Sequence, residues 1–139
     1  MKPKKSTAVV LDSWAVIAYL EGEESSEKVA NLIADAHEDG VPLLISVVNA
    51  AEVWYIVARE TSVAYADRAV KQLRDLSVEF VDADWTLAKE AGRFKSANKM
   101  MSLADAFAAA LTKQRKGHLA TGDPEFKHVE NEISLTWLK

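Results

Sequence analysis

The sequence predicts an α/β sandwich with a central, mostly parallel sheet. Short apolar runs rich in β-branched residues, typical of buried strands, alternate along the chain with longer segments whose apolar residues recur at helical spacing. No repeat, linker or biased tract interrupts the 139 residues, of which 49% are hydrophobic and 27% are charged. We therefore expect one domain over residues 1–139, long enough to bury a core.

The N-terminal part contains two of the predicted strands. Residues 7–11 form a short, continuous apolar run, and a helix is predicted immediately after it over 13–20, with Gly22 as a stop signal. An amphipathic helix is predicted over 25–38 because its apolar residues share one face. The second apolar strand follows over 41–46.

The middle of the chain departs from simple alternation. Residues 47–60 are predicted to be helical despite their β-branched residues, because of the segment's length and apolar stripe. A second amphipathic segment follows at once over 62–76, so the two helices together could form a helical arm. Residues 78–84 alternate like a strand, and 85–97 return to a helical pattern.

The C-terminal part repeats the alternation. A strong helix is predicted over 102–115 and ends at Lys116-Gly117. A strand over 118–121 leads into a turn, and a last strand is expected over 133–138. Strands joined through helices run parallel in a sheet, which gives the fold class stated above.

Composition and charge exclude several classes of protein. There is no cysteine, which excludes a disulfide framework and a thiolate metal site and suits a reducing compartment. The net charge of −4 argues against binding polyanions by overall charge and leaves a local basic patch open. No apolar run approaches the roughly 20 residues that span a bilayer. We interpret residues 1–6 as a basic tail, and we expect a soluble, cytoplasmic protein.

Four carboxylates occupy equivalent places in the predicted topology. Asp12 ends the first strand, and Glu52 lies about two turns into the helix that follows the second strand. Asp105 is in the first turn of the 102–115 helix, and Asp123 follows a strand. Ligands of open α/β sheets bind beyond the carboxyl ends of the strands, so we expect these four side chains to meet along one edge.

Clustered carboxylates point to a divalent cation. They repel one another and raise each other's pKa unless a cation neutralises them. Oxygen ligands suit Mg²⁺ or Mn²⁺, which keep several waters and share substrate phosphates. Such ions orient a phosphodiester and help to deprotonate an attacking water, so the cluster predicts phosphodiester hydrolysis.

Each acid also has a simpler explanation when it is taken alone. Asp12 could cap the next helix, and Glu52 could face solvent from a helix surface. Asp105 fits a capping box with Ser102, and Asp123 could begin a turn. The metal hypothesis depends on the joint order and placement of the four residues.

Four stretches of the chain resemble PIN-domain ribonucleases, and more closely the VapC toxins of prokaryotic toxin–antitoxin pairs. The matching stretches are "VVLDSWAVIAYL", "ISVVNAAEVWY", "SLADAFAAALT" and "LATGDPEF". The resemblance covers nearly the whole chain, with the acids in the expected order. It implies a PIN-like three-layer α/β/α sandwich and an endoribonuclease that depends on Mg²⁺ or Mn²⁺.

The resemblance also implies roles for individual residues. The four acids that match the family's catalytic and metal-binding positions are Asp12, Glu52, Asp105 and Asp123. Thr121 matches a hydroxyl position close to that site. The implied partners are an RNA substrate, a VapB-like antitoxin whose tail covers the acidic groove, and a second copy of the chain in a homodimer.

RNA contact by an acidic protein needs local basic and aromatic side chains. The basic residues expected to be nearer the site are Arg93, Lys95 and Lys99, and a second group is Lys113, Arg115 and Lys116. The aromatic residues that could stack on bases are Trp14, Trp54, Tyr55 and Trp85. Trp14 departs from the family pattern, in which a small residue or Ser/Thr is common, and it either shapes the groove or only packs.

Other functions remain open at this stage. A phosphotransfer enzyme could use Asp12 as its nucleophile, although the phosphatases of the haloacid dehalogenase type need a second Asp where this chain has Trp14. A PIN-fold binding module without turnover, or an RNA-processing nuclease outside a toxin–antitoxin pair, would also match the pattern. Metal-dependent RNA cleavage that is lost in the Asp12→Asn variant would separate these functions.

Overall fold

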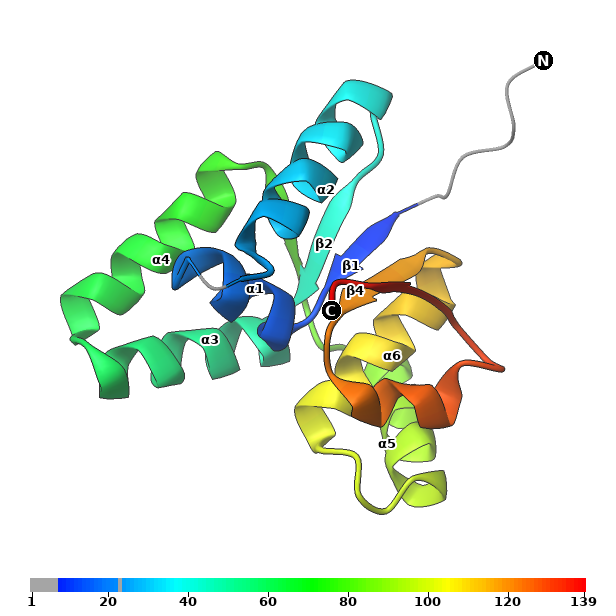
Figure 1. Ribbon diagram of the computed structural model, residues 1–139. Helices are drawn as coiled ribbons and strands as arrows, with labels where there is room; N and C mark the ends of the chain where they lie inside the picture. The colour runs from blue at the N-terminus through cyan, green and yellow to red at the C-terminus, as the bar shows by residue number, and fades with distance from the viewer. Residues whose placement is uncertain (1–7, 23) are drawn as a thin grey trace.

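The predicted sandwich and its parallel sheet are confirmed by a computed structural model, which describes residues 8–22 and 24–139 (Figure 1). The five strands are β1 (Val9–Leu11), β2 (Leu43–Ser46), β3 (Val78–Val81), β4 (His118–Thr121) and β5 (Ser134–Trp137). They lie in the order β3-β2-β1-β4-β5, and each neighbouring pair is parallel. The carboxyl ends of all five strands therefore lie at the same edge.

Helices cover both faces of the sheet. They are α1 (Ser13–Leu20), α2 (Ser26–Asp39), α3 (Val47–Glu60), α4 (Val63–Asp75), α5 (Trp85–Ala97) and α6 (Leu103–Arg115), with the 3₁₀ helix η1 (Pro124–Val129). The helices α1 to α4 lie on one side of the sheet, and α5 and α6 lie on the other (Figure 1). The six α-helices agree with the predicted segments to within one residue at each end. None of the helices in the described ranges has the length and apolar character needed to cross a bilayer.

The structure differs from the prediction in the strand before α5 and in the segment after β4, and in both places an aspartate caps a helix. The strand β2 is also shorter than the strand predicted over 41–46. The strand predicted over 78–84 ends at Val81, because Asp84 caps α5 and its Oδ1 accepts the Leu87 N–H at 2.9 Å. The helix η1 was not predicted, and Asp123 caps it in front of Pro124. Part of the predicted first strand and the predicted basic tail fall among residues 1–7, which lie outside the described residues.

The strands divide their side chains between two apolar layers. Val10 and Leu44 point to the α5–α6 side, whereas Leu11 and Ile45 point to the side of α1 to α4. All four of these side chains are fully buried, which explains why the strands are continuous apolar runs in the sequence. The two layers hold the sheet between them and fix the position of its carboxyl edge.

The segment predicted as two consecutive helices forms a helical hairpin of α3 and α4, which extends beside α1 (Figure 1). The inner face of α4 buries Ala66, Ala69 and Leu73. Trp54 of α3 donates its indole N–H to Asp67 Oδ1 of α4 at 2.9 Å. These contacts fix α3, which carries Glu52, against the rest of the fold.

The junction between α6 and β4 brings two backbones into direct contact. The His118 N–H donates to the Ala8 carbonyl at 3.0 Å and begins the pairing of β4 with β1. A Cβ atom at Gly117 would overlap that same carbonyl oxygen, so no side chain fits here. This contact sets the spacing between β1 and β4, whose far ends lead to Asp12 and Thr121.

Candidate active site

The four acids predicted to converge do so at the carboxyl edge of the sheet. Glu52, Asp105 and Asp123 line one pocket of about 340 Å³. Asp12 is buried next to Ser13, another lining residue, and its carboxylate interacts electrostatically with Asp105 and Asp123. Four elements that are remote in sequence thus place their carboxylates at one site.

The pocket is lined by both polar and apolar side chains. Besides the acids, it is lined by Ser13, Trp14, Ile17, Ile56 and Ser102. The apolar residues come from α1 and α3, and Glu52 lies on α3 as well, whereas Asp105 and Asp123 come from α6 and the turn after β4. Charged and apolar side chains are therefore neighbours in the lining of the pocket.

Asp12 is the most deeply buried of the four acids, with 1% of its surface exposed. The pKa of Asp12 is raised to about 7, mainly by burial and further by the charges of Asp105 and Asp123. Hydrogen bonds from Thr121 and Ala15 lower this pKa but do not cancel the effect of burial. Its Oδ1 accepts the Ala15 N–H at 2.8 Å, and its Oδ2 accepts the Thr121 hydroxyl at 2.5 Å. The ionised form is thus held in place but is costly without a nearby cation.

Thr121 links two of the acids. It is fully buried at the end of β4, and its Oγ1 donates to Asp12 and accepts the Asp123 N–H at 3.0 Å. The hydroxyl position expected from the sequence is therefore found between the first and the fourth acid.

Asp105 is half-buried in the first turn of α6. Burial raises the pKa of Asp105 to about 6, and the charges of Asp123 and Glu52 raise it as well, while hydrogen bonds with Ser102 lower it. The Asp105 N–H donates to Ser102 Oγ at 3.0 Å, which confirms Ser102 as the helix cap. Glu52 and Asp105 line the same pocket, which explains why the charge of Glu52 acts on Asp105.

Three of the acids have the local role suggested by the simpler explanation and also belong to the acidic site. Asp12 caps α1, Asp105 belongs to the capped first turn of α6, and Asp123 accepts the Glu125 N–H at 2.9 Å at the start of η1. A carboxylate has two oxygens with about four acceptor sites, so a cap leaves capacity for another ligand. Glu52 is half-buried and lines the pocket instead of an open helix face.

The four carboxylates fit a hard cation that keeps several water ligands better than a metal ion coordinated by protein atoms alone. All four groups are carboxylates, the ligands that Mg²⁺ and Mn²⁺ prefer. In the part of the chain that the structure describes, no three His, Asp or Glu side chains are arranged to hold a metal ion directly. Mg²⁺ usually takes one or two carboxylates directly and keeps several waters, so a site for this ion does not need three direct protein ligands.

Trp14 both packs and shapes the pocket, so the two alternatives raised by the sequence are found together. Its side chain is half-buried and lines the pocket, and its six-membered ring lies against Gly122. A Cβ atom at position 122 would overlap this ring. The close approach of Gly122 therefore places the tryptophan next to Asp123.

Three residues that shape this region were missed from the sequence, namely Ser13, Asn49 and Gly122. Ser13 and Asn49 are buried polar residues that bond to each other, with Asn49 Nδ2 donating to Ser13 Oγ at 3.2 Å. The available signals were a polar residue three positions before Glu52 in an apolar segment and a glycine between Thr121 and Asp123.

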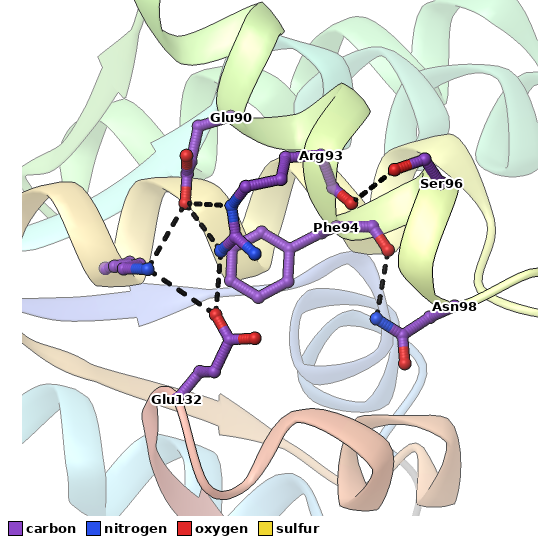
Figure 2. A network of polar contacts seen from close by, with 7 residues as sticks. Glu90, Arg93, Phe94, Ser96, Asn98 and Glu132 are labelled. Carbon is purple, nitrogen blue, oxygen red and sulfur yellow. Dashed lines mark hydrogen bonds and ion pairs between the residues drawn. The ribbon is translucent and has the colours of Figure 1, made fainter.

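Three of the basic residues expected to contact RNA are paired within the protein, namely Arg93, Lys113 and Arg115. The Arg115 Nη2 atom lies 3.9 Å from Glu79 Oε2. Figure 2 shows Arg93 between Glu90 and Glu132. The Arg93 Nη2 atom lies 2.8 Å from Glu90 Oε1 and 2.7 Å from Glu132 Oε2. Lys113 Nζ lies 3.5 Å from the same two carboxylates. The hydrogen bond with Arg93 is the main reason why the pKa of Glu90 and that of Glu132 lie below their ordinary value. This network links α5, α6 and the segment before β5.

Of the aromatic residues expected near RNA, only Trp14 lines the acidic pocket, among those that the structure describes. Trp54 is bonded to Asp67, and Tyr55 stacks with Arg59, whose guanidinium carbon is 5.0 Å from the ring centroid. Trp85 is 75% exposed at the start of α5. Of these four aromatic side chains, Trp14 is therefore the one that lies beside the acids.

Comparison with known families agrees with this arrangement of a parallel sheet and acids at its carboxyl edge. Residues 9–132 match the family model of the PIN domain. The chain therefore belongs to the PIN domain family. No curated protein sequence matches it significantly.

Solved structures with the same fold include VapC toxins. VapBC2 from Rickettsia felis, bound to a DNA fragment from its promoter, matches with a TM-score of 0.75 and 16% identity over 93% of this chain and 97% of that chain. VapC20 from Mycobacterium tuberculosis, a toxin that cleaves the sarcin–ricin loop, matches with a TM-score of 0.71 and 16% identity over 88% of this chain and 95% of that chain. DNA-bound VapBC from Salmonella typhimurium matches with a TM-score of 0.73 and 16% identity over 95% of this chain and 98% of that chain. At this level of identity the likeness concerns the fold.

Proposed function

We propose that this protein is a metal-dependent endoribonuclease that acts as the toxin of a toxin–antitoxin pair. The observation that carries the proposal is the convergence of four carboxylates around a buried Asp12, whose pKa burial raises to about 7. Support comes from the PIN domain match and from the similar fold of a toxin that cleaves the sarcin–ricin loop.

The residues proposed to hold Mg²⁺ or Mn²⁺, directly or through water, are Asp12, Glu52, Asp105 and Asp123. The ion, when bound, supplies charge stabilisation to the phosphodiester and acidifies the attacking water. Thr121 orients Asp12 through its Oδ2 atom, and Ser102 fixes the first turn that carries Asp105. Trp14, Ile17 and Ile56 add apolar surface to the lining of the pocket.

The proposed protein partner is a VapB-like antitoxin. Several of the similar structures are VapBC complexes, and the acidic pocket has the charge that accepts a basic side chain. We therefore expect a basic antitoxin segment to occupy the pocket and to inhibit cleavage by competing with the cation.

A homodimer is the other proposed assembly. Two apolar residues of α4, Val63 and Tyr65, are 57% and 53% exposed, whereas Val57 of α3 is buried in the monomer. Contiguous exposed apolar surface marks contact sites, so we propose this end of α4 as the part of the dimer interface to test by light scattering at several concentrations.

The proposed activity is tested by RNA cleavage with purified protein, with Mg²⁺ or Mn²⁺ or with a chelator. The Asp105→Asn variant is expected to lower the cleavage rate by about 100-fold or more, because it removes one charge from the site that stabilises the reaction. Asp35→Asn is the matched control, because Asp35 is an exposed residue of α2 remote from the pocket.

Three outcomes of this experiment differ in meaning. Cleavage that needs the divalent ion and is lost only in Asp105→Asn supports the nuclease. An equal rate in wild type and folded Asp105→Asn would identify a contaminating nuclease. Metal binding by the wild type without any cleavage would favour the binding module without turnover.

A further inference from the structure

Asn49 makes an unusual set of buried contacts in the first turn of α3. Its side chain is fully buried, and Nδ2 donates to Ser13 Oγ at 3.2 Å and to the Ala104 carbonyl at 3.1 Å. Ser13 Oγ in turn donates to the Asn49 carbonyl at 3.3 Å. Because the Ala104 carbonyl can only accept, the amide nitrogen of Asn49 must be the atom that faces it.

Each residue that Asn49 contacts is next in sequence to one of the acidic residues of the site. Ser13 follows Asp12, and Ala104 precedes Asp105. Asn49 itself lies three residues before Glu52, on the same side of α3. The amide of Asn49 therefore joins the starts of three helices. Its two partners, Ser13 and Ala104, lie 36 and 55 positions from Asn49 in the sequence.

The acids beside these contacts repel one another. The charges of Asp105 and Asp123 act on Asp12, and the charge of Glu52 acts on Asp105. Repulsion of this kind pushes α1, α3 and α6 apart at their N-terminal ends when no cation is present. A neutral amide can hold the three segments together without adding charge and without competing for the cation.

Among the residues that the structure describes, the side chain of Asn49 leaves one of its own hydrogen-bonding atoms unpaired. Its Oδ1 atom is buried and has no hydrogen-bond partner within the described part of the chain. The free-energy cost of an unpaired buried acceptor offsets much of what the two donated bonds contribute to stability. What these bonds still do is fix the relative positions of the segments that they join.

We propose that Asn49 is a positioning residue of the active site, which holds the starts of α1, α3 and α6 at the separation that lets Asp12, Glu52 and Asp105 share one hydrated cation, directly or through its waters. This inference rests on the proposed function, since it assigns a role within the same site. It predicts that the affinity for the cation depends on Asn49 even though Asn49 does not line the pocket.

The test is a calorimetric titration of the folded proteins with Mn²⁺ at low temperature. Asn49→Leu keeps the volume but removes both donated bonds, and its affinity for Mn²⁺ is expected to fall about tenfold. Ser13→Ala removes one of the two acceptors and is expected to give a smaller loss. Thr112→Val is the control, because it removes a buried hydrogen bond of α6, from Oγ1 to the Ala108 carbonyl at 2.8 Å, away from the acids.

A second measurement separates positioning from general destabilisation. RNA cleavage by Asn49→Leu is expected to be weak at low Mn²⁺ and to recover at excess Mn²⁺, whereas a purely structural defect would not respond to the ion. Thr112→Val should lower the melting temperature but leave the affinity for Mn²⁺ within twofold of wild type. If Asn49→Leu does not fold, Ser13→Ala decides the question by the same two measurements.

The result that overturns the inference is wild-type affinity for Mn²⁺ in folded Asn49→Leu or, if that variant does not fold, in Ser13→Ala. Equal losses in Asn49→Leu and Thr112→Val would overturn it too, because they would reflect stability alone. Failure of the wild type itself to bind Mn²⁺ would overturn both this inference and the proposed function. Binding by the wild type that Asp105→Asn abolishes and Asn49→Leu retains would overturn only the inference.

Discussion

Asp12→Asn is expected to stabilise the metal-free protein at pH 8 and to abolish RNA cleavage. Burial raises the pKa of Asp12 from its ordinary 3.8 to about 7, so the native protein at pH 8 contains an ionised carboxylate with 1% of its surface exposed. Asparagine is neutral, and its amide can still accept from the Ala15 N–H and meet Thr121. The variant therefore loses the cost of the charge together with the charge that a cation needs.

The sign of the pH dependence follows from proton binding. Between pH 4 and pH 7 native Asp12 holds a proton that the unfolded chain has already released, since the pKa of Asp12 is raised in the native state. The free energy of unfolding therefore falls as the pH rises through this range, by roughly 4 kcal/mol at most for this one group. Below pH 4 the carboxyl is protonated in both states, and the contribution no longer changes.

Urea unfolding without divalent ions, at pH 5 and at pH 8, measures this effect. The difference in stability between Asp12→Asn and wild type should be larger at pH 8 than at pH 5, and Mg²⁺ should stabilise only the wild type. Asp35→Asn should follow the wild type, because its side chain is exposed. A difference between Asp12→Asn and wild type that is the same at both pH values would show that Asp12 is not a buried acid of raised pKa.

Gly117→Ala is expected to destabilise the fold by about 3 kcal/mol, near the upper end of the usual cost of overpacking. The added Cβ would overlap the Ala8 carbonyl oxygen, a backbone atom that cannot turn away as a flexible side chain can. The same carbonyl accepts the His118 N–H that begins the β1–β4 pairing. Relief of the overlap must move the two strands apart, which also stretches the bond between Thr121 and Asp12.

Gly92→Ala makes the same chemical change with the opposite expected sign. A Cβ at position 92, within α5, meets no atom closer than 4 Å in the described structure, so alanine should stabilise the helix by about 0.5–1 kcal/mol. Urea unfolding of both variants measures the two effects. Similar free energies of unfolding for Gly117→Ala and wild type would show that β1 and β4 are not in the close contact described here.

The fold and the acidic residues could be predicted because both follow from local patterns. The strands are short apolar runs, the helices have apolar stripes, and Asp12 and Asp123 stand where strands end. Parallel strands then bring these ends to one edge. Capping of α1 by Asp12 and of α6 by Ser102 was also foreseeable from the sequence.

What could not be predicted depends on contacts between remote segments. The buried bonds of Asn49 join α3 to Ser13 and Ala104, and the overlap at Gly122 requires the position of Trp14. Likewise, nothing local shows that Arg93 pairs with Glu132, 39 residues away, instead of facing RNA. A single sequence gives the residue types but not which side chains meet.

The most direct test of the shared cation site is an NMR titration of the side-chain carboxyl groups of Asp12 and Asp105. Without divalent ions, burial should hold the pKa of Asp12 near 7 and that of Asp105 near 6. We predict that Mg²⁺ lowers both pKa values together and that both changes saturate at the same concentration of the ion. If both pKa values are unchanged in saturating Mg²⁺, or if only one responds, the four carboxylates do not form a shared cation site.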